Sequence, residues 1–300
     1  MIERFLAVIN PAAGGGRCGE LASAALDRVR QVGLEVEAIE TSQPREAVAI
    51  VRKAYARGVR SFLSVGGDGT AFEIVNGLFP EAETRGRPTL GFLPLGTGNS
   101  FLRDFTTRGF EHTIEALRDR RRRRCDIIRL RHHGDDIYFL NLLSLGFAAD
   151  VGEVTNRRFK HRGELGYVLG VLARLFDLNH QSFPHRLGDD VNWDRRESLF
   201  LSFSNSKFTG GKMMIAPDAN PCDGKIEYVR WGPVGRLRLL WTFPRLFSGT
   251  HIRHPRASRK SIERVEFDLE SPVNAMVDGE ILSVQCRSLE VLSGVLDVVV

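Results

Sequence analysis

Glycine-rich loops are the first feature of this 300-residue sequence that could support chemistry. Glycines cluster at residues 14–16, 66–69 and 96–98, and each cluster follows a short apolar run. Backbone N–H groups in such loops can approach phosphate oxygens because no Cβ stands in the way. One such loop is more typical of a tight strand-to-helix turn. Three of them at strand ends in one domain predict a phosphate-binding site.

The second loop also contains a carboxylate, Asp68. A carboxylate among phosphate-binding amides would repel the phosphate unless a metal ion or a substrate proton is involved. None of the loops is followed by the Gly-Lys-Ser/Thr of a Walker loop, and none fits the GxGxxG dinucleotide pattern at the first strand.

A second carboxylate in an informative setting is Asp278, in the segment Val277-Asp278-Gly279-Glu280. Asp-Gly is a strong hairpin signal, so a plain turn explains this segment when it is taken alone. A carboxylate presented by such a turn could also accept a proton as a general base. The residues alone leave both roles open.

The elements that must position these residues are indicated by apolar patterns in the first third of the chain, where strand-like segments alternate with segments of helical periodicity. We expect strands at 5–9, 34–39, 61–65 and 89–93, and helices at 17–31, 44–57 and 71–79. Strands that alternate with helices imply a parallel sheet in an α/β domain, which binds ligands at the carboxyl ends of its strands. The three glycine loops follow strands at those ends.

Strand-like segments dominate after the arginine run that ends at Arg124. We expect strands at 126–131, 137–144, 198–204, 225–230 and 264–269, with apolar helices at 165–178 and at 237–247, the latter interrupted by Pro244. Many strands with few helices predict a β-sandwich-like second domain. We therefore predict an α/β nucleotide-binding domain at 1–125 and a β-sandwich domain at 126–288. The strand-like segment 289–300 is compatible with a return to the first domain.

Composition is that of an ordinary globular protein, with 42% hydrophobic and 26% charged residues, which excludes disordered and fibrous classes. No apolar stretch approaches the roughly 20 residues of a membrane-spanning helix, and the first residues lack a signal-peptide pattern, so we expect a cytoplasmic protein. The four cysteines form no CxxC pair and are expected to be free thiols.

The net charge of +5 is concentrated in two basic runs, at 120–124 and at Arg253, Arg256, Arg259 and Lys260. Such runs could meet anionic lipid headgroups or nucleic acid, or could simply be a solvated surface. No nucleic-acid-binding motif accompanies them, so no nucleic-acid partner is expected.

Together, the loops resemble the catalytic domain shared by diacylglycerol, sphingosine and ceramide kinases. The resemblance rests on NPAAGGGR at 10–17, VGGDGT at 65–70 with EIVNGL at 73–78, and PLGTGN at 94–99. Farther on, NLLSLGF at 141–147, GGKMMIAP at 210–217 and VDGE at 277–280 resemble the second-domain signatures of the soluble bacterial members. Order and spacing match as well as residue type, and the resemblance covers nearly the whole chain.

The resemblance implies a nucleotide domain like those of phosphofructokinase and NAD kinase, a β-sandwich domain, an active site in the cleft between them, and ATP and Mg²⁺ as cofactors. It places Asp278 as the general base, supported by Glu280, with Asp68 as the rival for that role. It implies the following nucleotide-binding residues: Asn10, Pro11, Ala12, Ala13, Gly14, Thr41, Gly66, Gly67, Asp68, Gly69, Thr70 and Thr97.

A structural Mg²⁺ site is also implied by the resemblance of the loop at 220–225. Its ligands would be the oxygen of Asn220, the carboxylate of Asp223 and the backbone carbonyl of Lys225. Hard oxygen ligands of this kind suit Mg²⁺. Ser100 stands where many diacylglycerol kinases have Asp, which leaves the identity of the lipid open.

The function implied is that of an ATP-dependent lipid kinase that phosphorylates a hydroxyl of diacylglycerol or a related lipid. The alternatives are an NAD kinase-like enzyme and a non-catalytic, nucleotide-binding regulator associated with membranes. The expected partner is the lipid substrate at the membrane surface, reached by peripheral contact. A homodimer is also compatible with the sequence.

Overall fold

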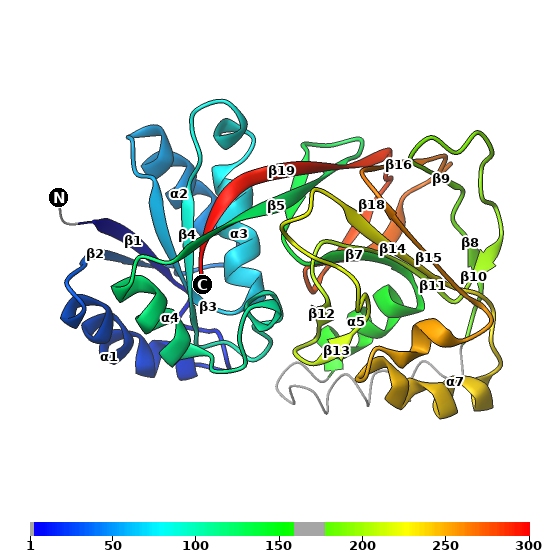
Figure 1. Cartoon of the computed structure of the whole chain (residues 1–300), viewed down its shortest axis with the longest axis horizontal. Coiled ribbons are helices and arrows are strands. Elements are labelled where there is room, and N and C mark those ends of the chain that lie inside the picture. Colours follow the sequence, from blue (N-terminus) through cyan, green and yellow to red (C-terminus); the bar gives the residue numbers. More distant parts are fainter. Residues whose placement is uncertain (1–2, 159–177) are drawn as a thin grey trace. The chain divides into compact units, whose positions relative to one another are not determined.

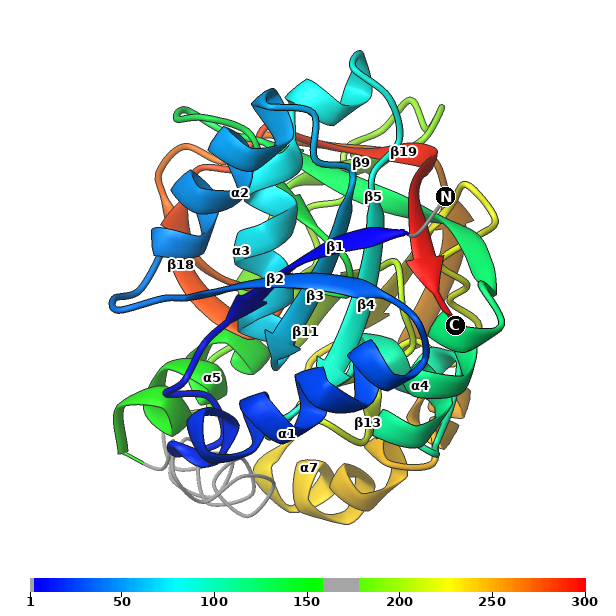
Figure 2. The same ribbon diagram turned by 90° about the vertical axis from the view of Figure 1, so that its left-hand side faces the viewer.

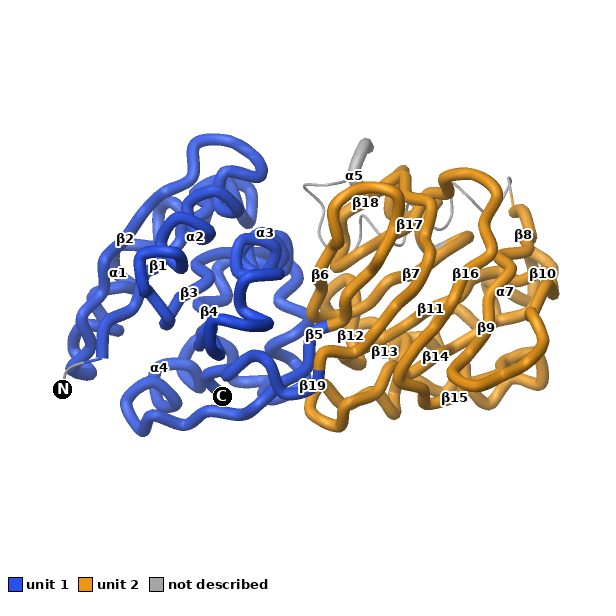
Figure 3. The backbone as a smooth tube through the Cα atoms, turned by 90° about the horizontal axis from the view of Figure 1, so that it is seen from above, with its two compact units in different colours: residues 1–127, 293–300 blue, residues 128–292 orange. Residues whose placement is uncertain are grey.

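The structure, a computed structural model, describes residues 3–158 and 178–300. The chain divides into two compact units, shown in different colours in Figure 3. Unit 1 comprises residues 1–127 and 293–300, and unit 2 comprises residues 128–292. The chain leaves unit 1 within strand β5 (Arg122–Arg131) and returns to it within strand β19 (Ser288–Val299).

Unit 1 is built on a parallel sheet, as strand-helix alternation predicts. The order of its strands is β2 (Glu35–Glu40), β1 (Arg4–Ile9), β3 (Ser61–Gly66), β4 (Thr89–Pro94) and the end of β19. All neighbouring pairs are parallel, including β4 with β19 through Thr89 and Asp297. The central strands are buried almost throughout, as expected for a parallel sheet covered on both faces.

Helices cover both faces of this sheet (Figure 2). One face packs against α1 (Arg17–Gln31) and α4 (Phe110–Arg118), whose apolar side chains share a core with Phe5, Ala7 and Ile9 of β1. The other face carries α2 (Glu46–Ala56) and α3 (Asp68–Leu78). The α3 helix begins at Asp68 and not at residue 71 as expected, because Asp68, Gly69 and Thr70 carry no apolar periodicity that would mark its first turn. Short 3₁₀ turns follow α3 and β4, at η1 (Glu81–Glu83) and η2 (Phe101–Asp104).

Unit 2 contains two sheets (Figure 1). The first is antiparallel, in the order β15 (Ala257–Ile262), β14 (Ile226–Trp231), β11 (Phe200–Ser204), β7 (Leu142–Gly146), β17 (Val273–Val277) and β18 (Glu280–Val284). The second contains β6 (Ile137–Phe139), β5, the start of β19, β16 (Arg264–Phe267) and β9 (His185–Leu187). Two short strand pairs complete the strands, β8 (Gln181–Ser182) with β10 (Glu197–Ser198) and β12 (Phe208–Thr209) with β13 (Met213–Met214).

Side chains from the two sheets of unit 2 meet in a common core. The rings of Phe203 on β11 and Phe267 on β16 lie 5.3 Å apart, and the His185 ring of β9 is hydrogen-bonded to the Tyr228 hydroxyl of β14 at 2.9 Å. This sheet-on-sheet packing confirms the predicted β-sandwich-like domain.

Helical segments of unit 2 differ in detail from expectation. They are α5 (Phe147–Arg158), α7 (Arg236–Thr242), η5 (Phe243–Leu246) and η6 (Thr250–Arg253). The helix expected at 237–247 ends as an α-helix at Thr242 and continues as a 3₁₀ turn, because Pro244 has no N–H to donate. The strand expected at 137–144 is interrupted at Leu140 and Asn141. The helix expected at 165–178 lies almost entirely outside the described residues.

Candidate active site

The three glycine loops follow β1, β3 and β4 at the carboxyl-terminal edge of the parallel sheet in unit 1. Backbone hydrogen bonds tie neighbouring loops together. The Asn10 N–H donates to the Val65 carbonyl at 3.0 Å, and the Gly96 N–H donates to the Gly66 carbonyl at 2.7 Å. The loops therefore form one surface, at the edge where α/β folds place their ligands.

Contacts between the loops are so close that a side chain at several glycine positions would force a neighbouring loop to shift. A Cβ on Gly96 would lie 2.5 Å from the Gly67 Cα, and a Cβ on Gly14 would lie 2.8 Å from the Leu95 carbonyl oxygen. Gly14 also has a φ of +65°, which side chains rarely adopt. Loop packing therefore explains these glycines before any ligand is considered.

Asp68 connects the loop after β3 to the loop after β4. Its carboxylate accepts the Ser100 N–H, 2.8 Å from either oxygen, and Oδ1 also accepts the Phe101 N–H at 3.3 Å. The residue lies in the first turn of α3, where the helix dipole favours a negative charge. A Cβ on Gly98 would lie 2.7 Å from Oδ2. Asp68 thus holds the 96–100 loop, which presents Thr97, against the start of α3.

The other predicted nucleotide-binding residues lie in or beside these loops. The Asn10 side chain accepts the Ala12 N–H at 3.1 Å and shapes the first loop. Thr41 follows β2, and its hydroxyl and N–H both donate to the Ile9 carbonyl, at 3.2 and 2.8 Å. Thr97 is exposed, whereas Thr70 is buried at the start of α3. The structure therefore brings together the set implied by the resemblance, and its role in nucleotide binding stays a prediction.

Asp278 lies in unit 2, in the two-residue turn between β17 and β18. Asp278 and Gly279 both have positive φ, of 49° and 91°, which is the geometry of an Asp-Gly hairpin. The residue is only 6% exposed, and its carboxylate accepts backbone N–H groups from Leu140 at 2.8 Å, Asn141 at 2.8 Å and Leu142 at 3.0 Å. The carboxylate thus fills the interruption between β6 and β7. Glu280, the next carboxylate of the hairpin, is exposed.

A buried polar network surrounds this interruption. The Asn205 side chain donates to the Leu140 carbonyl, and the Ser206 hydroxyl donates to the Asn141 side-chain oxygen, each at 2.8 Å. Asn141, Asn205 and Ser206 are all at most 4% exposed. Asn205 and Ser206 were not predicted from the sequence. Their position in a short polar segment directly after β11 is the feature that could have indicated them. The network holds Asp278 in a fixed position.

The predicted metal loop at 220–225 is a pair of side-chain-to-backbone turns. Asn220 Oδ1 accepts the Cys222 N–H at 3.2 Å, and Asp223 Oδ1 accepts the Lys225 N–H at 3.0 Å. Burial raises the pKa of Glu227, and the negative charge of Asp223 raises it further. The oxygen donors present suit a hard cation such as Mg²⁺. No group of three His, Cys, Asp or Glu side chains in the described part of the chain forms a ready-made metal site.

Comparison with known proteins places this arrangement in a family. Residues 4–130 match the model of the diacylglycerol kinase catalytic domain, and residues 141–300 match that of the YegS C-terminal NAD kinase beta sandwich-like domain. The chain belongs to the family of YegS-like lipid kinases, with a first unit that matches the diacylglycerol kinase catalytic domain. The predicted resemblance is thereby confirmed.

Named relatives match this family member over most of its length. A diacylglycerol kinase of Mycobacterium tuberculosis is 28% identical over 283 residues, covering 93% of this chain and 89% of its own. A YegS-like lipid kinase of Serratia proteamaculans is 30% identical over 223 residues, covering 74% of this chain and 70% of its own. A crystal structure of a diacylglycerol kinase from Bacillus anthracis shares the fold, with a TM-score of 0.71 at 18% identity over 99% of this chain and 96% of its own.

Two further expectations for this lipid kinase family member concern its cysteines and membrane segments. No disulfide joins the four cysteines, which all lie within the described residues, and burial, followed by the charge of Glu40, raises the pKa of the Cys18 thiol beside the first loop to about 11. Cys18 is therefore a protonated packing residue at neutral pH. None of the helices within 3–158 and 178–300 has the length and apolar character needed to cross a bilayer.

Proposed function

We propose that this protein transfers the terminal phosphate of ATP to a hydroxyl of diacylglycerol or a closely related lipid. The observation that carries the proposal is the single surface formed by the three glycine loops at the edge of the parallel sheet. Family membership supports a lipid kinase, and the M. tuberculosis relative is named for diacylglycerol.

In the proposed reaction the nucleotide phosphates lie against the glycine loops. The first turn of a helix has N–H groups without intrahelical partners, so the start of α3 favours an anion there. Asp68 keeps the 96–100 loop in place, which positions Thr97 for a phosphate oxygen. Bound Mg²⁺ would neutralise phosphate charge and allow the Asp68 carboxylate to lie near it.

Proton transfer is assigned to Asp278 in this proposal. The lipid hydroxyl oxygen forms a bond to the γ-phosphorus while the bond between that phosphorus and the β–γ bridging oxygen breaks, and ADP leaves. The hydroxyl proton passes to the Asp278 carboxylate, which three backbone N–H groups hold in one orientation. Exposed Glu280 adds negative charge at the same hairpin.

Purified protein with γ-labelled ATP, Mg²⁺ and a panel of acceptors tests the proposal. We expect label in diacylglycerol micelles or in a related hydroxyl lipid, and no label in NAD or in the absence of an acceptor. Gly67→Val should raise the KM for ATP or abolish binding, because Gly67 contacts the Gly96 loop. Labelled NAD would favour the NAD kinase alternative, and nucleotide binding without transfer to any lipid would favour the non-catalytic regulator.

A further inference from the structure

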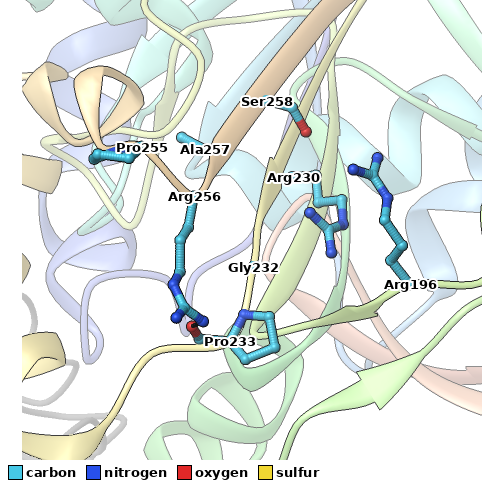
Figure 4. Close-up of a pocket in the computed structure, with 8 residues that line it drawn as sticks. All are labelled: Arg196, Arg230, Gly232, Pro233, Pro255, Arg256, Ala257 and Ser258. Carbon is cyan, nitrogen blue, oxygen red and sulfur yellow. Dashed lines mark hydrogen bonds between the residues drawn. The ribbon is translucent and has the colours of Figure 1, made fainter.

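Unit 2 has a pocket of about 240 Å³ that is lined by three arginines from three separate segments (Figure 4). Arg196 precedes β10, Arg230 lies on β14, and Arg256 precedes β15. The remaining lining residues are small, apolar or hydroxyl-bearing: Gly232, Pro233, Pro255, Ala257 and Ser258. No carboxylate lines this pocket among the residues that the structure describes.

Arg230 is the central group, because it is only 7% exposed and its partners are neutral. Its Nε donates to the Ser198 hydroxyl at 3.1 Å, and an Nη donates to the Glu197 carbonyl at 2.6 Å. Burial lowers the pKa of Arg230, and the positive charge of Arg196 lowers it further. A buried charge of this kind is stabilised by an anion that is brought to it.

The other polar groups in the pocket also point to an anionic ligand. Within residues 3–158 and 178–300 the buried Ser258 hydroxyl has no hydrogen-bond partner, and it lies on the side of the pocket where Arg196 and Arg230 meet (Figure 4). Arg196 forms a two-point ion pair with Asp194, at 2.9 and 2.6 Å, and Arg256 donates to the Pro233 carbonyl at 2.5 Å. Three guanidinium groups and one carboxylate leave two positive charges, which matches the roughly −1.5 to −2 of a phosphomonoester.

We infer that this pocket binds a phosphate group in its dianionic form, either free or as the headgroup of a phosphomonoester lipid. All residues that line the pocket belong to unit 2, and none of them has a role in the proposed reaction. It goes beyond the proposed reaction and does not depend on ATP.

Calorimetric titration with inorganic phosphate, glycerol 3-phosphate and vesicles containing a phosphomonoester lipid tests the site. Arg256→Gln and Ser258→Ala should each weaken phosphate binding by about 10-fold or more, the equivalent of one charge-assisted hydrogen bond. Arg259→Gln is the matched control, because Arg259 is exposed and paired with Asp218. Binding of phosphate but not of vesicles assigns the pocket to the free ion, and loss of vesicle binding in Arg256→Gln assigns it to a headgroup. Equal affinity in all three variants, or equal binding of chloride, overturns the inference.

An independent feature of unit 2 is an apolar surface on α7 and the turn that follows it. Leu237 and Trp241 are 80% and 83% exposed, and Leu240 and Phe247 are each 38% exposed. Among the described residues, the other large exposed apolar side chains are Leu21 and Val191 alone. The opposite side of the segment is anchored in the core of unit 2 by Leu239 and Leu246.

Charge distinguishes the kind of partner that this apolar surface fits. Residues 232–262 contain seven Lys and Arg and no Asp or Glu. Arg236, Arg238 and Arg245 alternate with the exposed apolar residues along α7 and η5. Tryptophan, leucine and arginine together are typical of segments that lie in the interface of an anionic bilayer. The basic run at 120–124 is less suited, because Arg122 is paired with Glu3 and Arg121 lies 3.9 Å from Asp119.

We propose that Leu237, Leu240, Trp241 and Phe247 dock on the surface of an anionic membrane, with the neighbouring arginines on lipid phosphates. This docking places the protein at a bilayer whether or not the lipid kinase reaction is as proposed above. It is therefore measured without ATP, so that its failure is distinct from failure of the proposed function.

Vesicle co-sedimentation and tryptophan fluorescence test the docking surface. Binding to anionic vesicles should weaken with salt, and Trp241 emission should shift to the blue. Leu237→Asp should weaken binding by about 10-fold or more, because burial of a leucine contributes about 1.5–3 kcal/mol. Val191→Asp, at another exposed apolar residue, should bind like the unchanged protein. Equal binding by both variants refutes the proposal, and a dimer in analytical ultracentrifugation that only Leu237→Asp disrupts assigns the surface to a second copy of the chain.

Discussion

Asp278→Asn is the perturbation whose outcome the structure specifies in most detail. The asparagine carbonyl can replace Oδ1 and accept the Asn141 and Leu142 N–H groups, but its NH₂ group then faces the Leu140 N–H. One hydrogen bond to a charged acceptor is lost, and a buried donor is left without an acceptor. At 6% exposure water cannot replace the lost partner, so we expect the free energy of unfolding to fall by about 2–4 kcal/mol.

Thermal unfolding measures this part of the prediction. A change of 1 kcal/mol shifts Tm by roughly 2–4 °C in a domain of this size, so Tm should fall by roughly 5–15 °C. Glu280→Gln is the matched control, since it changes an exposed carboxylate of the same hairpin and should leave Tm nearly unchanged. An unchanged Tm for Asp278→Asn would refute the structural reasoning.

Activity of the same variant, assayed well below its Tm, tests the proposed proton transfer. If Asp278 is the general base, kcat should fall by about 10²- to 10⁴-fold while ATP binding is retained. Near-normal kcat with a lipid acceptor would exclude Asp278, and loss of activity in Asp68→Asn with ATP affinity intact would then assign the base to Asp68.

Three further predictions concern the loops, a buried histidine and the metal loop. Gly96→Ala should lower the free energy of unfolding by about 1–3 kcal/mol and weaken ATP binding, because its Cβ would lie 2.5 Å from the Gly67 Cα. Chemical unfolding and nucleotide titration measure the two effects. Gly235→Ala, where a Cβ would meet open space, should show neither effect. Burial lowers the pKa of His251 to about 4, so the stability that depends on its neutral form is complete above about pH 6.5 and is lost as the pH falls toward 4. The loss should reach roughly 1.5 kcal/mol at pH 5.5, measured by urea unfolding at that pH and above pH 6.5. His251→Gln should show a weaker pH dependence of stability than the unchanged protein, and an equal dependence in the two proteins would contradict the assignment. Millimolar Mg²⁺ should raise Tm, and Asp223→Asn should remove this effect while Asp189→Asn, at another exposed carboxylate, retains it; an effect that survives in Asp223→Asn would place the ion elsewhere.

Local sequence patterns were sufficient for the parallel sheet and its loops. The predicted strands at 5–9, 61–65 and 89–93 are short apolar runs that lead into glycine-rich loops, and burial on both faces of a parallel sheet requires that pattern. The strand predicted at 34–39 rested on alternation instead, and it is largely exposed. The turn at Asp278 was also readable from Asp-Gly alone. The start of α3 was not, because an aspartate and a glycine at a helix start carry no apolar period.

Long-range partners could not be predicted from local patterns. The carboxylate of Asp278 binds amides 136 to 138 residues away, and no neighbour in the sequence signals that contact. The arginine pocket likewise joins residues 196, 230 and 256, which only the sandwich fold brings together. The exposure of Trp241 could not be predicted from the sequence either, because the apolar residues at 237–247 would also suit a helix that is buried on all sides.

The contact between the glycine loops limits how the sequence can diverge. Gly96 faces Gly67, and Gly14 faces the Leu95 carbonyl, so a side chain on one loop is tolerated only after the facing loop has moved away. Substitutions in the two loops should therefore be strongly non-additive, with a second change compensating the first by an interaction energy of about 0.5–3 kcal/mol. An evolutionary path that replaces one of these glycines is therefore favoured when the facing loop changes with it. A library that randomises two facing loops together should contain more functional variants with side chains at these positions than a library that randomises one loop.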